Sequence, residues 1–368
     1  MGSVDPTVLF AGGGTGGTVG PGIAIAERLR EHRPGIDLRF ICSDRPVDGR
    51  LLDPDGWPSV ATPARSPSVR PRAALAFLRG WWGTRRITGR ILQEQSGRCR
   101  LIALGGFVAP PVVSEAVRRG CPVDLINLDA VAGRANQWIG RRANRVFTAV
   151  PTDLPHDLSP VGVPLRRAAM VCVSAAEARR TLGLTEHRRT LLVTGASQGA
   201  RSLDRFLLED VGRGDAAWKD WQVLHLAGGE VQRLEAAYRA AGIPAVVRPF
   251  LDRMGLAWAA ADIAISRGGA SSVAEIAASR TPSIIVPYPW HADQHQARNA
   301  AELETMGAIE IREDPSRGIE AENLLLDTLH RWLTEPDEVA RRHEAFPDRA
   351  ADAADVLAKA ILAELDQE

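Results

Sequence analysis

Short apolar runs alternate with amphipathic helical patterns along most of the chain, and this rhythm limits the possible folds more than any other feature. The runs lack the polar alternation of strands that face solvent, which is typical of strands buried on both faces of a parallel sheet. They lie at 8–11, 37–43, 99–106, 122–128 and 145–150, and again at 189–195, 221–229, 245–250, 262–269 and 282–289. The pattern predicts an α/β fold with helical crossovers, its first helix at 23–31.

A proline-rich segment without apolar periodicity, residues 150–167, separates the two series of runs. The 368 residues are enough for two domains of about 150–200 residues each. We therefore expect an N-terminal domain at 1–164 and a C-terminal domain at 165–345, both Rossmann-like. The alanine-rich segment 346–368 predicts a final amphipathic helix.

Composition excludes several classes of protein. The 45 Lys and Arg residues balance 45 Asp and Glu residues, so nothing indicates a nucleic-acid partner. The four cysteines form no C-x-x-C pair, which favours buried free thiols over disulfides or zinc. No apolar stretch is long enough for a membrane span. These features predict a cytoplasmic protein.

The first glycine-rich loop has Gly12, Gly14 and Gly17 in the pattern G-x-G-x-x-G, between a strand and a helix. This is the dinucleotide fingerprint in its proper context, and Asp44 would be its ribose-binding acid. Any tight turn from strand to helix also favours glycine, so the motif alone is weak. An NAD-dependent oxidoreductase is one hypothesis that it leaves open.

The second loop, LLVTGASQGAR at 191–201, imitates the opening of short-chain dehydrogenases. Arg201 replaces the last glycine of that motif, and neither Tyr238 nor Tyr288 has a lysine four residues later. Because those enzymes need the tyrosine–lysine pair for proton transfer, this class is excluded.

The third loop, at 264–279, again joins a strand to a helix. Gly268 and Gly269 free the backbone, and Ser271 and Ser272 offer a helix cap or hydroxyl contacts to phosphate. Glu275 has two interpretations: it accepts hydrogen bonds from vicinal hydroxyls such as those of a ribose, or it caps its own helix.

A polar stretch follows the next strand, with His291, Asp293, His295 and Gln296 close together. The spacing allows metal ligands, but no further Cys/His cluster supports a metal site. Sugar hydroxyls, which need several donors and acceptors in one place, suit His295 and Gln296 better.

Taken together and in order, these loops resemble the MurG family of glycosyltransferase family 28. The matching segments are GGGTGGTVGPGIAIAERL, GGFVAPPVV, DAVAGRANQWIG, VGVPLR, TGASQGAR, RPFLDRM, ADIAISRGGASSVAEIA and HADQHQARNA. The family transfers N-acetylglucosamine (GlcNAc) from UDP-GlcNAc to the lipid-linked sugar lipid I, making lipid II for peptidoglycan. The resemblance implies a GT-B fold, in which two Rossmann-like domains face across a cleft and the C-terminal helix crosses back to the first. It also implies an inverting transfer that needs no metal or other cofactor. A metal-using transferase would carry a D-x-D motif. Asp53 and Asp55 have this spacing, but they surround a proline and are interpreted as part of a turn.

The resemblance also implies the contacts of the donor. Glu275 would hold the ribose, and Phe250 and Leu251 would frame the uracil. His295 and Gln296 would contact the sugar, and Ser197 and Arg166 would lie near the phosphates. Backbone groups would be presented to the diphosphate by Ala270, Ser271, Ser272, Val273 and Ala274. In the first loop, Thr15, Gly16 and Gly17 would face the transferred sugar and the acceptor phosphates.

The acceptor side departs from the family pattern. Thr18 stands where the family has a histidine, Phe107 replaces a tyrosine, and Asn127 and Asp129 replace a glutamate and an asparagine. Because a threonine hydroxyl cannot act as a general base near neutral pH, Thr18 can only position or hydrogen-bond. Asp129 is the available carboxylate for the catalytic base. Two alternatives remain open: transfer to a different acceptor, and a non-catalytic paralogue that binds nucleotide sugars.

The segment 65–90 contains seven arginines and no acidic residue, and Trp81 and Trp82 lie among them. Aromatic rings beside arginines suit the interface of an anionic membrane. The segment predicts peripheral attachment, which the resemblance places on the cytoplasmic face. An ordinary core helix with a solvated basic face is the alternative.

Overall fold

The structure, a computed structural model, describes residues 6–14, 16–68, 70–95, 98–155, 160–195, 200–290, 293–348 and 351–367. The chain divides into two compact units, which are described separately: unit 1 comprises Met1–Arg166 with Ala351–Glu368, and unit 2 comprises Arg167–Ala350. Among the described residues, each unit is built on one six-stranded sheet in which the paired strands are parallel. The predicted α/β class is therefore confirmed.

The sheet of unit 1 has the strand order β3-β2-β1-β4-β5-β6. Its strands are β1 (Thr7–Ala11), β2 (Asp37–Ser43), β3 (Ser59–Thr62), β4 (Cys99–Ala103), β5 (Val123–Asn127) and β6 (Arg145–Thr148). Every residue of β1 is buried, because β1 lies between β2 and β4 and helices cover both faces of the sheet.

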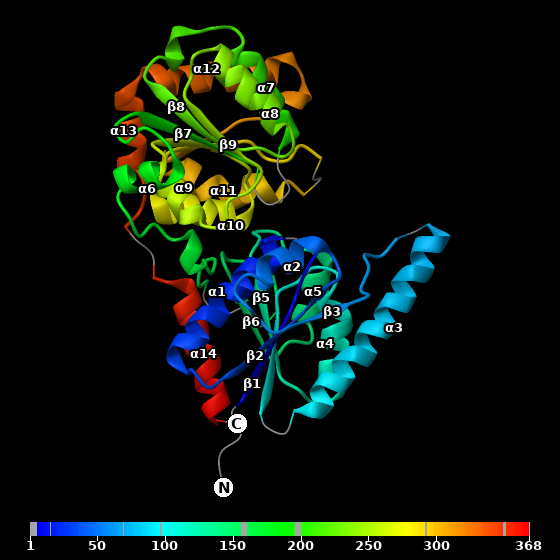
Figure 1. Ribbon diagram of the computed structural model, residues 1–368. Coiled ribbons are helices and arrows are strands. Elements are labelled where there is room, and N and C mark those ends of the chain that lie inside the picture. The colour runs from blue at the N-terminus through cyan, green and yellow to red at the C-terminus, as the bar shows by residue number, and fades with distance from the viewer. Residues whose placement is uncertain are drawn as a thin grey trace. The chain divides into compact units, whose positions relative to one another are not determined.

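Helices α4 and α5 cover one face of this sheet, and α1 and α14 lie side by side on the other (Figure 1). The helices of unit 1 are α1 (Gly16–His32), α2 (Pro46–Leu52), α3 (Pro71–Glu94), α4 (Ala109–Arg118), α5 (Arg134–Gly140) and α14 (Ala353–Gln367). Arg28 in α1 pairs with Asp352 at 3.0 Å, and His32 pairs with Asp355 at 2.7 Å. These ion pairs attach the last helix of the chain to the first.

The sheet of unit 2 has the order β12-β11-β10-β7-β8-β9. Its strands are β7 (Arg189–Thr194), β8 (Trp221–Leu226), β9 (Ala245–Arg248), β10 (Ile263–Ser266), β11 (Ser283–Ile285) and β12 (Ile309–Ile311).

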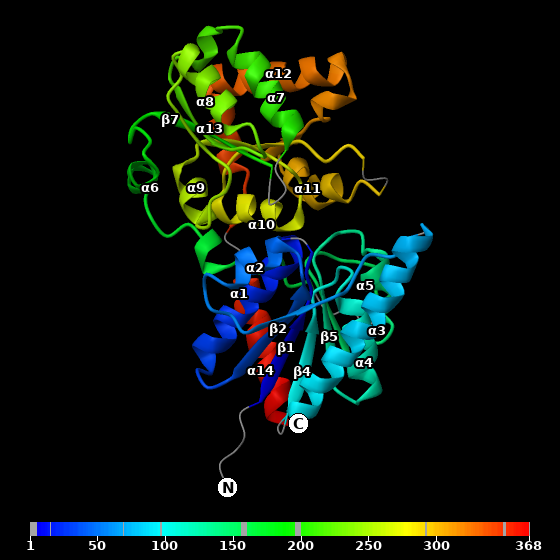
Figure 2. The same ribbon diagram turned by 45° about the vertical axis from the view of Figure 1, so that its right-hand side comes forward.

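Two apolar clusters bury the two faces of this sheet. One packs α7, α8 and α12 onto it, and the other packs α6, α9, α10 and α11. The helices are η1 (Arg167–Ala169), α6 (Ala175–Leu182), α7 (Arg201–Val211), η3 (Ala216–Trp218), α8 (Val231–Ala240), α9 (Met254–Ala260), α10 (Ala270–Ser279), α11 (His295–Thr305), η4 (Pro315–Arg317), α12 (Ile319–Thr334) and α13 (Pro336–Glu344). Figure 2 shows α9, α10 and α11 next to one another in one layer.

Three expectations need correction. The first helix begins at Gly16 rather than at residue 23, so part of the glycine-rich segment is helical. The short edge strands β3 and β12 are absent from the predicted runs. The thiols are free, as expected, but Cys172 is exposed, and Cys99 and Cys121 are half-buried because they lie at the ends of apolar runs rather than within them.

Each sheet has a point where the strand order reverses, between β1 and β4 in unit 1 and between β7 and β10 in unit 2. In open parallel sheets, ligands bind beyond the carboxyl ends of the strands at such points. The loops that begin there include all three glycine-rich loops. In the part of the chain that the structure describes, no helix is both long and apolar enough to cross a membrane.

Candidate functional site

The third glycine-rich loop opens an anion-binding position at the start of α10. The strand β10 ends at Ser266, and Gly269 is the N-cap of α10 without a side-chain cap bond. The first intrahelical bond runs from the Val273 N–H to the Gly269 carbonyl at 3.0 Å. The preceding N–H groups of a helix have no carbonyl partner within it, and together with the helix dipole they attract an anion such as a diphosphate.

Helix α11 packs closely against this loop. A Cβ atom at Gly268 would lie 2.3 Å from the Gln296 carbonyl oxygen, so only glycine fits there. The Asn299 side chain donates to the Gly268 carbonyl at 3.2 Å. The packing places the start of α11, with His295 and Gln296, beside the start of α10.

Both polar residues at the start of α11 have partners. The Gln296 Oε1 atom accepts from the Tyr288 N–H at 2.8 Å, and the His295 ring contacts Asp293 at 2.8 Å. These bonds fix the loop before α11 and leave the Gln296 amide N–H₂ as its donor group. His291, the other histidine of the proposed metal spacing, lies outside the described residues.

Glu275 is half-buried and reaches from α10 to α9. Its Oε2 atom accepts a 2.7 Å hydrogen bond from the Trp258 indole N–H. Burial raises the pKa of this carboxyl to about 7, while the indole bond opposes the rise. The contact differs from a helix cap, because Glu275 bonds to the neighbouring helix rather than to the start of its own.

The remaining predicted donor contacts are less closely grouped. Phe250 and Leu251 lie in the loop between β9 and α9, where Phe250 is exposed and Leu251 packs against the apolar cluster. Arg166 is the last residue of unit 1 in this part of the chain, and its guanidinium pairs with Asp55 at 2.7 Å. Ser197 and Thr15 lie outside the described residues.

A buried ion pair fixes the residue that precedes the two glycines of the third loop. Arg267, which precedes the two glycines, pairs with Asp314 at 2.6 Å and donates to Ser202 at 2.9 Å. Burial alone would raise the pKa of Asp314, but the hydrogen bonds from Ser316 and Ser202 and the charge of Arg267 lower it. The contacts link residues 47 and 65 positions apart, so no local sequence pattern predicted them.

In unit 1, a buried carboxylate fixes the first glycine-rich loop. The Gly14 N–H donates to Asp48, 2.9 Å from each carboxylate oxygen, and Ser43 donates to the same group through its N–H and hydroxyl. Asp48 is fully buried. Because a protein carboxylate occupies the Gly14 N–H, this backbone group is not available to a nucleotide phosphate.

The loops after β1 and β4 meet closely. A Cβ atom at Gly14 would lie 2.3 Å from the Phe107 ring, and one at Gly106 would lie 3.0 Å from the Gly13 carbonyl oxygen and 3.7 Å from Thr18. Thr18 is half-buried in the first turn of α1. The two residues that replace the family's histidine and tyrosine therefore belong to one cluster of loops.

Asp129 lies two residues beyond β5, at the same carboxyl edge of the sheet. The buried Asn127 side chain donates to the Asp129 carbonyl at 2.8 Å and accepts from Asn136 at 2.9 Å. These bonds fix the turn through its backbone. The Asp129 side chain is half-buried.

Three acidic residues from the sequence hypotheses have structural roles. Asp44, the candidate ribose acid of a dinucleotide site, pairs with Arg65 at 2.7 Å on the surface. Asp53 and Asp55 lie in a turn after α2, as expected.

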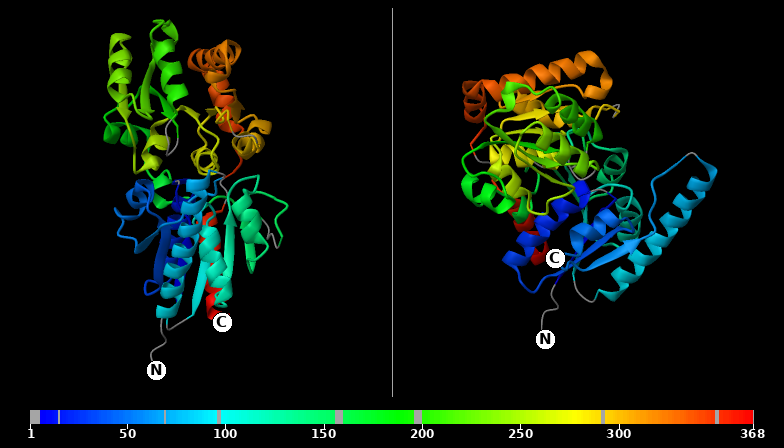
Figure 3. Two further views of the ribbon diagram at one scale, coloured as in Figure 1. Left: turned by 90° about the vertical axis from the view of Figure 1, so that its right-hand side faces the viewer. Right: turned by 45° about the horizontal axis from the view of Figure 1, so that its top comes forward.

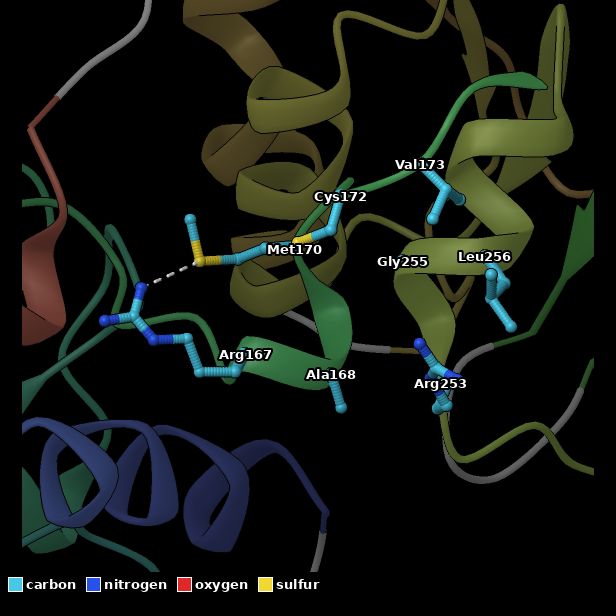
Figure 4. A pocket seen from close by; sticks show the side chains of 8 residues that line it. All are labelled: Arg167, Ala168, Met170, Cys172, Val173, Arg253, Gly255 and Leu256. Atoms are coloured by element: carbon cyan, nitrogen blue, oxygen red, sulfur yellow. Dashed lines mark hydrogen bonds between the residues drawn. The ribbon is translucent and has the colours of Figure 1, made fainter. Parts of the chain in front are cut away.

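A cavity of unit 2 is lined mainly by residues near the start of this unit and of α9. This cavity, of about 260 Å³, combines two arginines with mostly apolar walls (Figure 4). It is lined by Arg167, Ala168, Met170, Cys172, Val173, Arg253, Gly255 and Leu256. None of these residues is a predicted donor contact, so the cavity is distinct from the group around α10.

Two family models match the chain. The glycosyltransferase family 28 N-terminal domain matches residues 8–148, and the glycosyltransferase family 28 C-terminal domain matches residues 190–357. The chain belongs to glycosyltransferase family 28. It is therefore a glycosyltransferase, and the hypothesis of an NAD-dependent oxidoreductase is discarded.

Two relatives align with most of the chain. The Bordetella petrii relative is 35% identical over 372 residues, covering 96% of this chain and 98% of its own. The Acidothermus cellulolyticus relative is 37% identical over 331 residues, covering 84% and 86%. Both are named UDP-N-acetylglucosamine–N-acetylmuramyl-(pentapeptide) pyrophosphoryl-undecaprenol N-acetylglucosamine transferase. The resemblance to the MurG family is confirmed.

Solved structures agree on the fold of this family 28 member. Acinetobacter baumannii MurG matches with a TM-score of 0.70 at 24% identity, over 98% of this chain and all of that one. A UDP-N-acetylglucosamine 2-epimerase matches with a TM-score of 0.66 at 11% identity, over 100% of this chain and 98% of that one. At these identities the likeness shows the fold alone.

Proposed function

We propose that this glycosyltransferase transfers GlcNAc from UDP-GlcNAc to lipid I, forming lipid II. The names of its relatives support this donor and acceptor. The observation that carries the proposal is the arrangement at α10, where an uncapped helix N-terminus lies near the half-buried carboxylate of Glu275 and beside the amide of Gln296. These groups suit a diphosphate, a ribose diol and a sugar, respectively.

The transfer is a single displacement with inversion. A hydroxyl of the acceptor sugar attacks the anomeric carbon of GlcNAc, its proton passes to a base, and the bond to UDP breaks so that UDP leaves with the electron pair. Helix N-termini and arginine would stabilise the charge of the leaving diphosphate, and no metal ion or other cofactor is required.

Asp129 is the proposed base, and Thr18 is the proposed positioning group, both in unit 1. Both follow strands at the carboxyl edge of one sheet, at or next to its switch point. The predicted contacts of Gly16 and Gly17 with the transferred sugar belong to the same proposal.

A second candidate is the same transfer to a different acceptor, lipid-linked or soluble. It is favoured by the replaced residues Thr18, Phe107 and Asp129, which all lie in unit 1 rather than around α10. A chain that binds nucleotide sugars without turnover is the remaining alternative.

We expect UDP-GlcNAc to stabilise the protein without a divalent cation. A ligand at 100 times its Kd adds about 2.7 kcal/mol to the free energy of unfolding, which raises the Tm of a unit of this size by about 5–10 °C. The measurement is a thermal unfolding scan in EDTA with UDP-GlcNAc, UDP or GDP-mannose. An absence of any shift with UDP-GlcNAc in both EDTA and Mg²⁺ would contradict the proposed function.

The attachment to an anionic membrane is proposed through α3. Its exposed apolar side chains Leu75, Leu78 and Trp82 are 50%, 52% and 63% accessible. Their spacing of three and four residues places them on one side of the helix. The residues of α3 that are buried are small or lie near its end, Gly80, Thr84, Thr88, Gly89 and Ile91. The N-terminal half of α3 extends away from the sheet (Figures 1 and 3), which disagrees with an ordinary core helix.

A basic pocket of about 460 Å³ lies between α3 and α4, and the exposed Trp82 is one of the residues that line it. It is lined by Trp82, Arg85, Arg86, Gly89, Arg90, Gln93, Glu115, Arg118 and Arg119. The buried Glu115 carboxylate holds Arg85 at 3.0 Å and Arg119 at 2.7 Å, and also binds Arg118. Hydrogen bonds from Arg118 above all, and from Arg119 and Arg85, lower the pKa of Glu115 to about 2. The five arginines that line this pocket, only three of which pair with Glu115, suit the phosphates of lipid headgroups.

Charge reversal at Arg86 and Arg90 is expected to weaken binding to anionic vesicles. Each lost basic residue removes about 1 kcal/mol of attraction, so the double variant Arg86→Glu and Arg90→Glu should bind at least about 30-fold more weakly. Sedimentation with phosphatidylglycerol vesicles measures this, with phosphatidylcholine vesicles as the neutral surface. The matched control is Arg233→Glu with Arg239→Glu, the same charge change on exposed residues of α8. Equal loss in both double variants would refute a specific role for α3.

A further inference from the structure

The Trp258 indole is almost fully enclosed within unit 2, yet its polar N–H does not point into the apolar cluster. Trp258 lies on α9 and is 2% accessible, with its rings among the apolar residues beneath α10. Its N–H reaches the Glu275 carboxylate at 2.7 Å. A buried indole N–H requires an acceptor, and a bond to a carboxylate is stronger than one between neutral groups.

The bond occupies only part of the carboxylate. A carboxylate offers about four lone-pair positions, of which the indole takes one on Oε2. Glu275 Oε1 has no hydrogen-bond partner among the residues that the structure describes. One oxygen is therefore anchored and the other is left for a ligand.

We propose that Trp258 is a positioning residue of the donor site, whose indole N–H holds the Glu275 carboxylate in the orientation that accepts the vicinal hydroxyls of a nucleoside ribose. This inference rests on the proposed function, because it assumes that UDP-GlcNAc binds at α10. Trp258 itself touches no reacting atom. It acts through Glu275 alone.

The electrostatics of Glu275 agree with this role. Burial raises its pKa to about 7, and the indole bond is the one opposing influence. Charged groups on several neighbouring elements do not set this pKa: Arg167 on η1, Glu177, Arg179 and Arg180 on α6, Arg253 at the start of α9, Arg280 at the end of α10, and His295, Arg298, Glu302 and Glu304 on α11. Without the indole N–H, more of the carboxyl would be protonated at neutral pH, and a protonated carboxyl is a poorer acceptor for two hydroxyls.

The same unit contains a matched tryptophan. Trp218 is 3% accessible and its indole N–H donates to the Asp210 carboxylate at 3.1 Å, on the opposite face of the sheet. Trp218→Phe removes an equivalent bond far from α10. Comparing it with Trp258→Phe separates the loss of a buried hydrogen bond from the loss of a ligand-binding geometry.

The experiment measures the Kd of UDP by titration calorimetry from pH 6 to pH 9. The Trp258→Phe variant is expected to bind UDP about tenfold more weakly than the wild type at pH 7, because it loses a charge-assisted hydrogen bond. The pH below which the variant loses affinity for UDP should be higher than in the wild type. The difference in Kd between the variant and the wild type should therefore be smaller at pH 9 than at pH 7. Trp218→Phe should keep the wild-type affinity and profile. In the transfer reaction, Trp258→Phe should raise KM for UDP-GlcNAc and leave kcat almost unchanged.

A double variant tests whether Trp258 acts through Glu275. In a Glu275→Gln background, Trp258→Phe should cause no further tenfold loss. If Trp258→Phe fails to fold, benzothienylalanine at position 258 keeps the ring shape and lacks the N–H. Wild-type affinity and pH profile in the variant without the N–H would overturn the inference while the proposed function stands. A wild-type protein that binds no UDP would instead refute the proposed function itself.

Discussion

Replacing Glu275 by glutamine is expected to weaken UDP-GlcNAc binding at pH 8 by about 10–100-fold, the range for lost hydrogen bonds to a charged group. At this pH the carboxylate, whose pKa is about 7, is mostly ionised, the form in which it is proposed to accept both ribose hydroxyls. Glutamine keeps the size and one acceptor oxygen but loses the charge. Calorimetry with UDP-GlcNAc and the KM of the transfer reaction both measure the effect.

The same substitution is expected to stabilise the protein at alkaline pH. The folded-state pKa of Glu275, about 7, lies above the value of 4.5 for a free side chain, so burial favours the protonated form. This contribution to stability is complete below pH 4.5 and is lost as the pH rises through 7. The Tm of Glu275→Gln should therefore exceed that of the wild type at pH 8, by about 2–4 °C for each kcal/mol gained, and the gap should close toward pH 5.

An exposed position on the adjacent helix provides the control for both effects. Glu302→Gln makes the same chemical change on α11 and should alter neither affinity nor the pH dependence of the Tm. If Glu275→Gln bound UDP-GlcNAc as tightly as the wild type, Glu275 would not be the ribose acceptor.

Replacing Asp129 by asparagine is expected to lower kcat by about 10²–10⁴-fold, the usual contribution of a general base. The KM for UDP-GlcNAc should change little, because most of the proposed donor contacts lie in unit 2. The turn around Asp129 should persist, since Asn127 bonds to its backbone carbonyl rather than to its carboxylate. Initial rates with saturating UDP-GlcNAc and lipid I measure the effect.

Thr18→Val serves as the comparison for Asp129→Asn. It removes a hydroxyl from the same unit without removing a base, and should cost much less in kcat than Asp129→Asn. Full activity of Asp129→Asn would eliminate Asp129 as the base and direct attention to another group near the acceptor.

The central strands could be predicted because burial on both faces makes them continuous apolar runs. The edge strands could not. In β3 only one of four residues is buried, and β12 has only three residues, so neither carries a recognisable period. The start of α1 was missed because Gly16, Gly17, Gly20 and Gly22 are poor helix formers. Close packing explains the last of them, since a Cβ at Gly22 would lie 2.5 Å from the Leu104 side chain.

The candidate site shows the same division between local and long-range information. The strand, glycine loop and helix around Gly268 are a local pattern and were predicted together with Glu275. The Trp258 partner comes from a different helix, and its contact depends on how α9 and α10 are rotated against the sheet. Asp48 lies 34 residues from Gly14 and replaces the expected anion at that loop. Such contacts require tertiary structure, which no short motif encodes.

The most direct test of the proposed function is the transfer reaction itself. Purified protein is incubated with UDP-GlcNAc labelled in the sugar and with lipid I, in EDTA, and the lipid fraction and released UDP are quantified. The proposal predicts labelled lipid II and UDP in equal amounts, with no product when lipid I is omitted. Binding of UDP-GlcNAc without any labelled lipid product, in EDTA or in Mg²⁺, would contradict it.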